Sequence, residues 1–222
     1  MQQILQEDGN VIIKSQQPAA LRFFGHVISV VFHPLFIPIY VCCFILYWHP
    51  IVFAGYSPYD KLRSLASVFV NLTLLPAFTV FLLWRLKFIS SIYLKTQKER
   101  IIPFAATMLF SFWCWNVFRN LPDYPEHFTN FLLGSFITII VGWLANIYFK
   151  ISMHGLAAGG MLAFVLGVAI TGEGSSGQYI AAAILLTGLI CTARLIVSDH
   201  KPFEVYAGLF VGAACQWLAF VF

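Results

Sequence analysis

The sequence predicts an all-α fold, a polytopic transmembrane helical bundle with six to seven spanning helices. Of the 222 residues, 60% are hydrophobic, 17% aromatic and only 10% charged. A soluble domain carries roughly 25% charged residues and about 45–50% apolar ones, so this chain lacks the polar side chains that a water-exposed surface needs. Long apolar runs also recur along the chain, separated by short segments that contain Pro, Gly, Asp and Asn. These observations exclude a soluble globular domain.

Seven stretches of the chain are predicted to cross the membrane. A helix needs about 20 apolar residues to cross a hydrocarbon core roughly 30 Å thick. The stretches that meet or approach this length are Val27–Tyr47, Leu65–Trp84, Ile101–Phe118, Phe128–Phe149, Met153–Ile170, Tyr179–Val197 and Pro202–Phe222. Each is predicted to be helical, because unpaired backbone N–H and C=O groups cannot face lipid. Pro34, Pro38 and Pro76 lie inside such stretches and are expected to kink them.

Two parts of the chain differ in polarity. Residues 1–26 are interpreted as a polar N-terminal arm, which is too short to build a core of its own. Residues 27–222 show no further change in composition, and we interpret them as a single transmembrane domain. The spacing of the Cys, His, Asp and Glu residues does not resemble a zinc or magnesium site, so we expect no metal and no cofactor.

The basic residues concentrate on one side of the predicted membrane domain. If all seven stretches cross, one face carries ten of the 13 Lys and Arg residues, namely Lys14, Arg22, Arg85, Lys87, Lys95, Lys98, Arg100, Lys150, Arg194 and Lys201. The other face carries Lys61, Arg63 and Arg119. The positive-inside rule would make the first face cytoplasmic.

Three polar clusters lie on this basic face, each at the mouth of a different predicted helix. They are the segments 95–103, 150–155 and 194–208. Two predicted crossings separate the first cluster from the second, and two more separate the second from the third. Because an even number of crossings returns the chain to the same side, the three clusters can meet. We therefore expect one site that is built from all three.

The side chains of these clusters suit phosphoryl transfer. Such a reaction needs cations around the phosphoryl oxygens, a nucleophile in line and an acid for the leaving oxygen. A histidine can act as the nucleophile, and Glu204 follows His200 by one helical turn, where it can hold the imidazole in one tautomer. A second histidine, His154, can serve as general acid and then as general base. The remaining histidines, interpreted as interfacial or structural, are His26, His33, His49 and His127.

The third cluster resembles the signature of the type-2 phosphatidic acid phosphatase superfamily, which includes the vanadium haloperoxidases. That signature reads Ser-Arg, five residues, His, three residues and Asp. Arg194, His200 and Glu204 keep this spacing, with Ala193 at the Ser position and Glu204 itself at the Asp position. Val205 then follows, as in the usual form of the signature.

The other two clusters resemble the remaining motifs of the same family. Ser152 and His154 match the Ser and His of the motif Pro-Ser-Gly-His. Arg100, with Lys95 or Lys98 before it, is loosely similar to the motif Lys, six residues, Arg-Pro. The three motifs keep the family's order along the chain, and the resemblance covers residues 95–212.

The resemblance to the integral-membrane lipid phosphatase branch of this family implies a function. The chain would be a metal-independent membrane enzyme that hydrolyses a lipid phosphate or diphosphate, and the domain 27–222 would be phosphatase-like. His200 would be the nucleophile that forms a phosphohistidine intermediate, His154 the general acid and Glu204 the carboxylate that orients His200. The implied phosphate-binding residues are Arg194, Arg100, Lys95, Lys98 and Ser152.

Three other interpretations fit the same residues. A phosphotransferase would use the same histidine chemistry and pass the phosphoryl group or headgroup to an alcohol. A non-catalytic relative would bind or translocate phospholipid headgroups. An unrelated carrier would use the basic residues for topology alone. We expect membrane lipids rather than nucleic acid as partners, because no large basic surface outside the membrane is predicted, and a bacterial inner membrane as the location.

Overall fold

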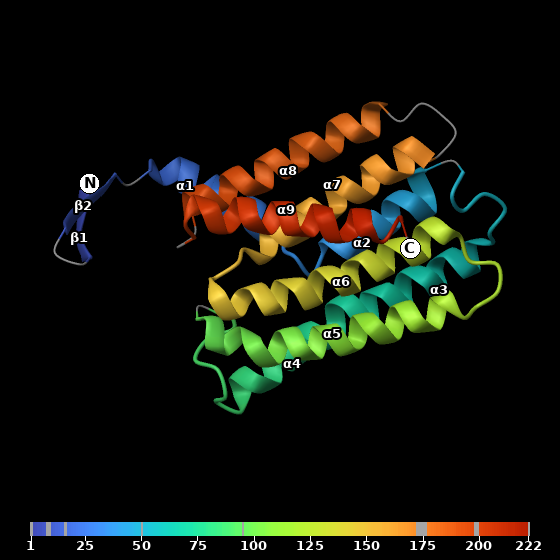
Figure 1. Cartoon of the computed structure of the whole chain (residues 1–222), viewed down its shortest axis with the longest axis horizontal. Helices are drawn as coiled ribbons and strands as arrows, with labels where there is room; N and C mark the ends of the chain where they lie inside the picture. Colours follow the sequence, from blue (N-terminus) through green and yellow to red (C-terminus); the bar gives the residue numbers. More distant parts are fainter. Residues whose placement is uncertain are drawn as a thin grey trace.

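The structure is a computed structural model of the chain. It describes residues 17–49, 51–94, 96–171, 177–197 and 200–221, and the backbone of residues 2–7 and 10–15. The N-terminal arm contains two antiparallel strands, β1 (Gln2–Glu7) and β2 (Asn10–Ser15), which pair as a hairpin. Figure 1 shows this hairpin beyond the N-terminal end of the first helix.

Five helical stretches are long and apolar enough to cross a membrane. The first is continuous from Pro58 to Arg85 and consists of α3 (Pro58–Val68), the π-helical segment η2 (Phe69–Leu74) and α4 (Leu75–Arg85). The others are α5 (Gln97–Arg119), α6 (Glu126–Tyr148), α7 (Met153–Thr171) and α8 (Gly177–Val197). The prediction of a helical membrane protein is therefore confirmed, and five of the seven predicted spans are found among the described residues.

The first predicted span, Val27–Tyr47, is not one helix. The chain forms α1 (Ala19–Val31), then a turn, then α2 (Ile37–Cys43) and the π-helical segment η1 (Phe44–Trp48). Pro34 has no N–H to continue a helix, and the next N–H, that of Leu35, donates to Nδ1 of His33 instead of to a helical carbonyl. The apolar run predicted the location of this segment, but the break divides it into two helices that are each too short to count as a span.

The last helix is also shorter than predicted. It is α9 (Pro202–Leu218), which has 17 residues, whereas the apolar run extends to Phe222. Proline opens α9 at a position where a missing N–H costs nothing.

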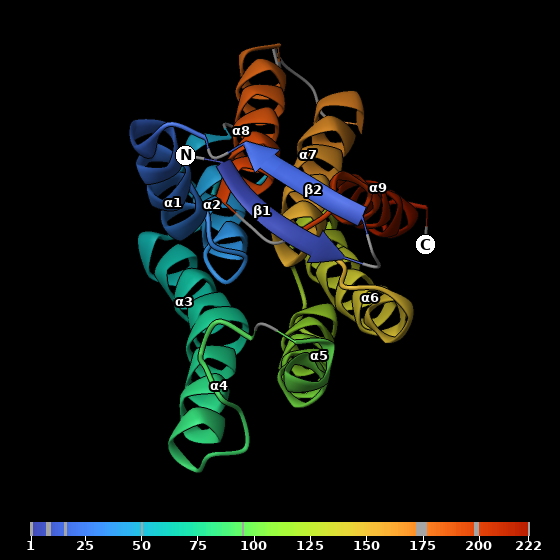
Figure 2. The same cartoon turned by 90° about the vertical axis from the view of Figure 1, so that its left-hand side faces the viewer.

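Helix α7 lies among α6, α8 and α9 and packs against all three (Figure 2). Its approach to α9 is especially close, because glycines face the opposite backbone on both sides. A Cβ atom on Gly155 of α7 would lie 2.5 Å from the carbonyl oxygen of Val205, and one on Gly208 of α9 would lie 2.7 Å from that of Ser152. Small residues of this kind let membrane helices approach each other. They hold the N-terminal ends of α7 and α9 side by side.

The alternation of helix directions brings several helix ends together. In Figure 1 the N-terminal ends of α5, α7 and α9 and the C-terminal ends of α4, α6 and α8 lie at the same end of the bundle. We call this the site end, because Arg100, His154, Arg194 and His200 lie there. The opposite end carries the turns after η1 and α5.

Candidate active site

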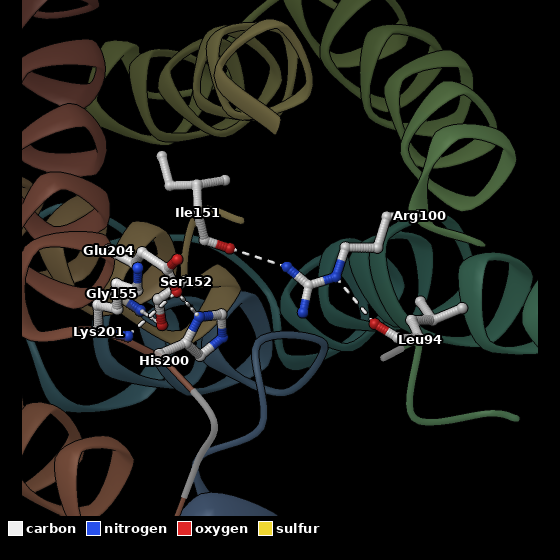
Figure 3. Close-up of polar contacts among 8 residues, drawn as sticks. All are labelled: Leu94, Arg100, Ile151, Ser152, Gly155, His200, Lys201 and Glu204. Carbon is white, nitrogen blue, oxygen red and sulfur yellow. Dashed lines mark hydrogen bonds and ion pairs between the residues drawn. The ribbon is translucent and has the colours of Figure 1, made fainter. Parts of the chain in front are cut away.

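Backbone and side-chain hydrogen bonds join the three polar clusters at the site end (Figure 3). Arg100, in the first turn of α5, is only 4% exposed. Its Nε donates to the carbonyl of Leu94 and its Nη1 to that of Ile151, both at 2.9 Å. The second bond links the first cluster to the second. A guanidinium has five N–H donors, so among the described residues three donors of Arg100 are left for a ligand.

The second and third clusters meet through the backbone. The N–H of Ser152 donates to the carbonyl of Glu204 at 3.1 Å. The hydroxyl of Ser152 accepts from the N–H of Gly155 at 3.3 Å, as a helix N-cap does, and Ser152 is fully buried. In this arrangement Ser152 holds the first turn of α7, which carries His154.

His200 and Glu204 form a close pair (Figure 3). Nδ1 of His200 lies 2.7 Å from Oε2 of Glu204, which also accepts from the backbone N–H of Lys201 at 3.2 Å. The two side chains are 5% and 13% exposed. Because a carboxylate can only accept, the proton of the neutral imidazole sits on Nδ1. The lone pair of His200 is therefore on Nε2, the nitrogen that a nucleophile would use.

Burial sets the charge state of His200. It lowers the pKa of His200 below the ordinary value of 6.5. The hydrogen bond that His200 donates to Glu204 opposes this shift, and nearby Arg100 lowers the pKa further. The lowered pKa favours the neutral imidazole at pH 7. A charged imidazolium at this position could not act as a nucleophile.

His154, at the start of α7, contacts the segment where α1 ends. Its Nε2 lies 3.0 Å from the carbonyl oxygen of Ser29. A carbonyl oxygen only accepts, so Nε2 of His154 carries the proton in this contact. In the neutral ring the second nitrogen, Nδ1, therefore has no proton. The ring of His33 packs edge-to-face on that of His154, with centroids 5.5 Å apart and planes at 80°.

A cavity of about 750 Å³ connects these residues. Its lining includes Arg100, His154, Arg194 and His200 at the site end. The remainder is mostly apolar, with contributions such as Val80, Phe104, Phe131, Ile139 and Met161 from α4 to α7. Gln216 also lines the cavity, and it lies 14 residues beyond the start of α9. At 1.5 Å per residue the cavity therefore reaches about 20 Å along the helix axis.

The structure brings together most of the predicted site residues. Four of them line one cavity, and Glu204 lies behind His200. Ser152 does not line the cavity, and its hydroxyl caps α7. Lys98 is exposed and also lies outside the lining. Lys95 lies outside the described residues.

Several lining residues were not among the predicted site residues. Among the polar ones are Ser29, His26, His33 and Lys150. The prediction treated His26 and His33 as interfacial or structural, whereas both line the cavity. One signal in the sequence marks His33, although it marks His49 equally. A titratable residue followed by proline inside an apolar run indicates a polar break in a membrane helix, and intramembrane titratable residues are functional candidates.

Within the part of the chain that the structure describes, no group of three or more His, Cys, Asp or Glu side chains is placed to hold a metal ion. Comparisons with protein-family models, with curated proteins and with solved structures give no match to this chain.

Proposed function

We propose that this chain is an integral-membrane phosphatase that hydrolyses a lipid phosphate or diphosphate through a phosphohistidine intermediate, without a metal. The observation that carries the proposal is the pair of His200 and Glu204 beside a cavity that Arg100 and Arg194 also line. A neutral imidazole protonated on Nδ1, so that Nε2 is the nucleophilic nitrogen, next to two guanidinium groups, is the arrangement that attack on a phosphate requires.

In the first step, Nε2 of His200 attacks the phosphorus atom. The new N–P bond forms as the P–O bond to the leaving group breaks, and the electron pair of that bond stays on the leaving oxygen. That oxygen takes a proton from protonated His154. Glu204 stabilises the positive charge that develops on the His200 ring, and Arg100 and Arg194 offset the charge on the phosphoryl oxygens.

In the second step, water attacks the phosphorus atom of the phosphohistidine. His154, now neutral, takes a proton from this water, and the N–P bond breaks with its electron pair returning to Nε2 of His200. Inorganic phosphate leaves, and both histidines return to their starting protonation states. General acid–base catalysis by one histidine in both steps follows from microscopic reversibility.

The shape of the cavity supports a lipid substrate. Its cationic part lies at the site end and its apolar part follows the helices for about 20 Å, so a phosphate and a hydrocarbon chain would occupy different parts of one cavity. Polyprenyl diphosphates, phosphatidylglycerol phosphate and phosphatidic acid all combine these two parts.

The proposal also includes the family, the number of membrane spans and the location of the protein. The chain would be a divergent member of the type-2 phosphatidic acid phosphatase superfamily, on the strength of its three motifs. The broken helix α1–α2, the helix α9 or both would cross the membrane together with the five long helices, which gives six to seven spans. The proposed location is a bacterial inner membrane.

The test is phosphate release by the purified protein from a panel of lipid phosphates and diphosphates. We expect the wild type to hydrolyse at least one of them, and His200→Ala to lower the rate by more than about 10³-fold, as loss of a nucleophile does. His127→Ala is the matched control, because His127 lies at the opposite end of the bundle, and it should keep its activity. Full activity of His200→Ala, or no hydrolysis of any lipid by the wild type, would overturn the proposal.

Two outcomes would point to the alternatives. Transfer of the phosphoryl group or headgroup to an added alcohol in preference to water would indicate a phosphotransferase. Phosphate binding without turnover would indicate a non-catalytic relative.

A further inference from the structure

We infer that His33 is a positioning residue for His154, so that the break between α1 and α2 forms part of the active site. This inference rests on the proposed function, because it concerns the general acid of that reaction. It adds to the site a segment that lies more than 60 residues before the first of the three motifs.

The segment contacts His154 in two ways. The carbonyl of Ser29 accepts from Nε2 of His154 at 3.0 Å, and the ring of His33 packs on the ring of His154 with an interplanar angle of 80°. Ser29 lies in the last turn of α1 and His33 just beyond its end, so both contacts come from the segment where α1 stops. An imidazole that is bonded at one nitrogen and packed by a second ring cannot rotate freely about its χ2 angle.

These contacts decide which nitrogen delivers the proton. Since Nε2 of His154 is bonded to a backbone carbonyl, the nitrogen that can protonate a leaving oxygen is Nδ1. The His33 ring, packed edge-to-face on the His154 ring, restrains this orientation. Nδ1 of His33 accepts from the N–H of Leu35 at 3.3 Å. This hydrogen bond, within the turn between α1 and α2, fixes the ring of His33 in turn.

A further observation connects the same segment to a ligand. The Oγ atom of Ser29 is buried and has no hydrogen-bond partner among the described residues, and Ser29 lines the cavity. A buried hydroxyl without a partner is unfavourable. A phosphoryl or leaving-group oxygen in the cavity beside His154 would supply the missing partner.

A purely structural role for His33 makes a different prediction. In that case its only task would be to accept the N–H of Leu35 and so to cap the break. His33→Asn separates the two roles, because an Asn side chain accepts from the backbone two residues on in the same way but has no ring to pack on His154. His49→Asn is the matched control. Nδ1 of His49 accepts from the N–H of Ile51, also two residues on, at the opposite end of the bundle.

The experiment compares two substrates in detergent-solubilised full-length protein. One is a lipid phosphate that the wild type hydrolyses, and the other is a nitrophenyl phosphate that carries an alkyl tail. Nitrophenolate leaves without needing a proton, so its release in the first turnover, before water attacks the phosphohistidine, does not depend on His154. We expect His33→Asn to lower kcat for the lipid phosphate by about 10- to 100-fold with little change in KM. For the nitrophenyl ester the first-turnover rate of nitrophenolate release should fall by less than about threefold, and His49→Asn should leave both rates unchanged.

Each other outcome contradicts the inference. Full activity of His33→Asn on the lipid phosphate would show that capping is the whole role of His33. An equal loss on both substrates, together with a lower melting temperature, would show a general structural defect. In both cases the wild type remains a phosphatase and only the role of His33 fails. If the wild type hydrolyses neither substrate, the proposed function fails and the inference with it.

Discussion

The two ends of the bundle each bury histidines, but they surround them differently. At the site end, His33, His154 and His200 line one cavity with Arg100 and Arg194. At the opposite end, the ring of His49 packs against aromatic rings, at 5.7 Å from Phe44 and 6.2 Å from Tyr179. Burial lowers the pKa of both His49 and His200, but a carboxylate opposes this shift for His200.

The comparison is sharpest between His33 and His49. Each is followed by proline in the sequence, and each accepts a backbone N–H from the residue two positions on. The local interaction is therefore the same. The difference lies in the neighbour across the contact, which is His154 for His33 and Tyr179 for His49. A local motif caps a turn at both ends, and the tertiary neighbours decide whether that turn also belongs to a reactive site.

The largest expected effect at the site end concerns Glu204. Glu204→Gln removes the charge that stabilises the His200 imidazolium, so kcat should fall by about 10²- to 10⁴-fold. Glu99→Gln is the matched control, since Glu99 caps α5 as Glu204 caps α9 but is bonded to Ser90 and the backbone of Thr96 rather than to a histidine. Steady-state phosphate release checks both variants. A loss of similar size for Glu99→Gln would mean that capping, not charge, explains the effect.

A second effect tests whether the contact between α7 and α9 holds the clusters together. Gly208→Ala places a Cβ atom 2.7 Å from the backbone carbonyl of Ser152, and backbone cannot yield as a flexible side chain does. We expect a cost of about 1–3 kcal/mol in stability and a parallel loss of activity. At Gly188 of α8 a Cβ atom would meet nothing within 4 Å. Gly188→Ala should leave both properties unchanged or slightly improved, as thermal unfolding and activity measured together would show.

The opposite end should respond in stability alone. His49→Ala removes the acceptor for the N–H groups of Ile51 and Val52, which should cost about 1–3 kcal/mol. The rate per folded molecule should not change, because His49 does not line the cavity. Thermal unfolding and active-site-normalised turnover test this, and a lowered kcat would contradict the division between the two ends.

The smallest expected effect is a shift in the pH profile. His200 must be neutral to attack, and burial lowers its pKa below 6.5, so on the acid side of the profile kcat/KM should decline below about pH 6.5. Glu204 raises the pKa of His200 by hydrogen bonding and charge. In Glu204→Gln the acid limb should therefore move to lower pH. A shift to higher pH would indicate that the limb belongs to another group.

Much of this protein could be predicted from its sequence, because some determinants depend only on the order of residues. The apolar runs predicted a helical membrane protein, since backbone groups in lipid must be satisfied within a helix. The number of crossings between Arg100, His154 and His200 predicted that they meet at one end. The four-residue spacing of His200 and Glu204 predicted their contact, which the structure places at 2.7 Å.

Other features required the tertiary structure. The apolar run from Val27 could not show whether Pro34 kinks a helix or ends it. The outcome depends on which acceptor the N–H of Leu35 bonds to. The hydroxyl of Ser152 suits a phosphate ligand and a helix cap equally well, and only the position of Gly155 shows the cap. The packing of His33 on His154 depends on contacts between residues more than 100 positions apart, which no local pattern encodes.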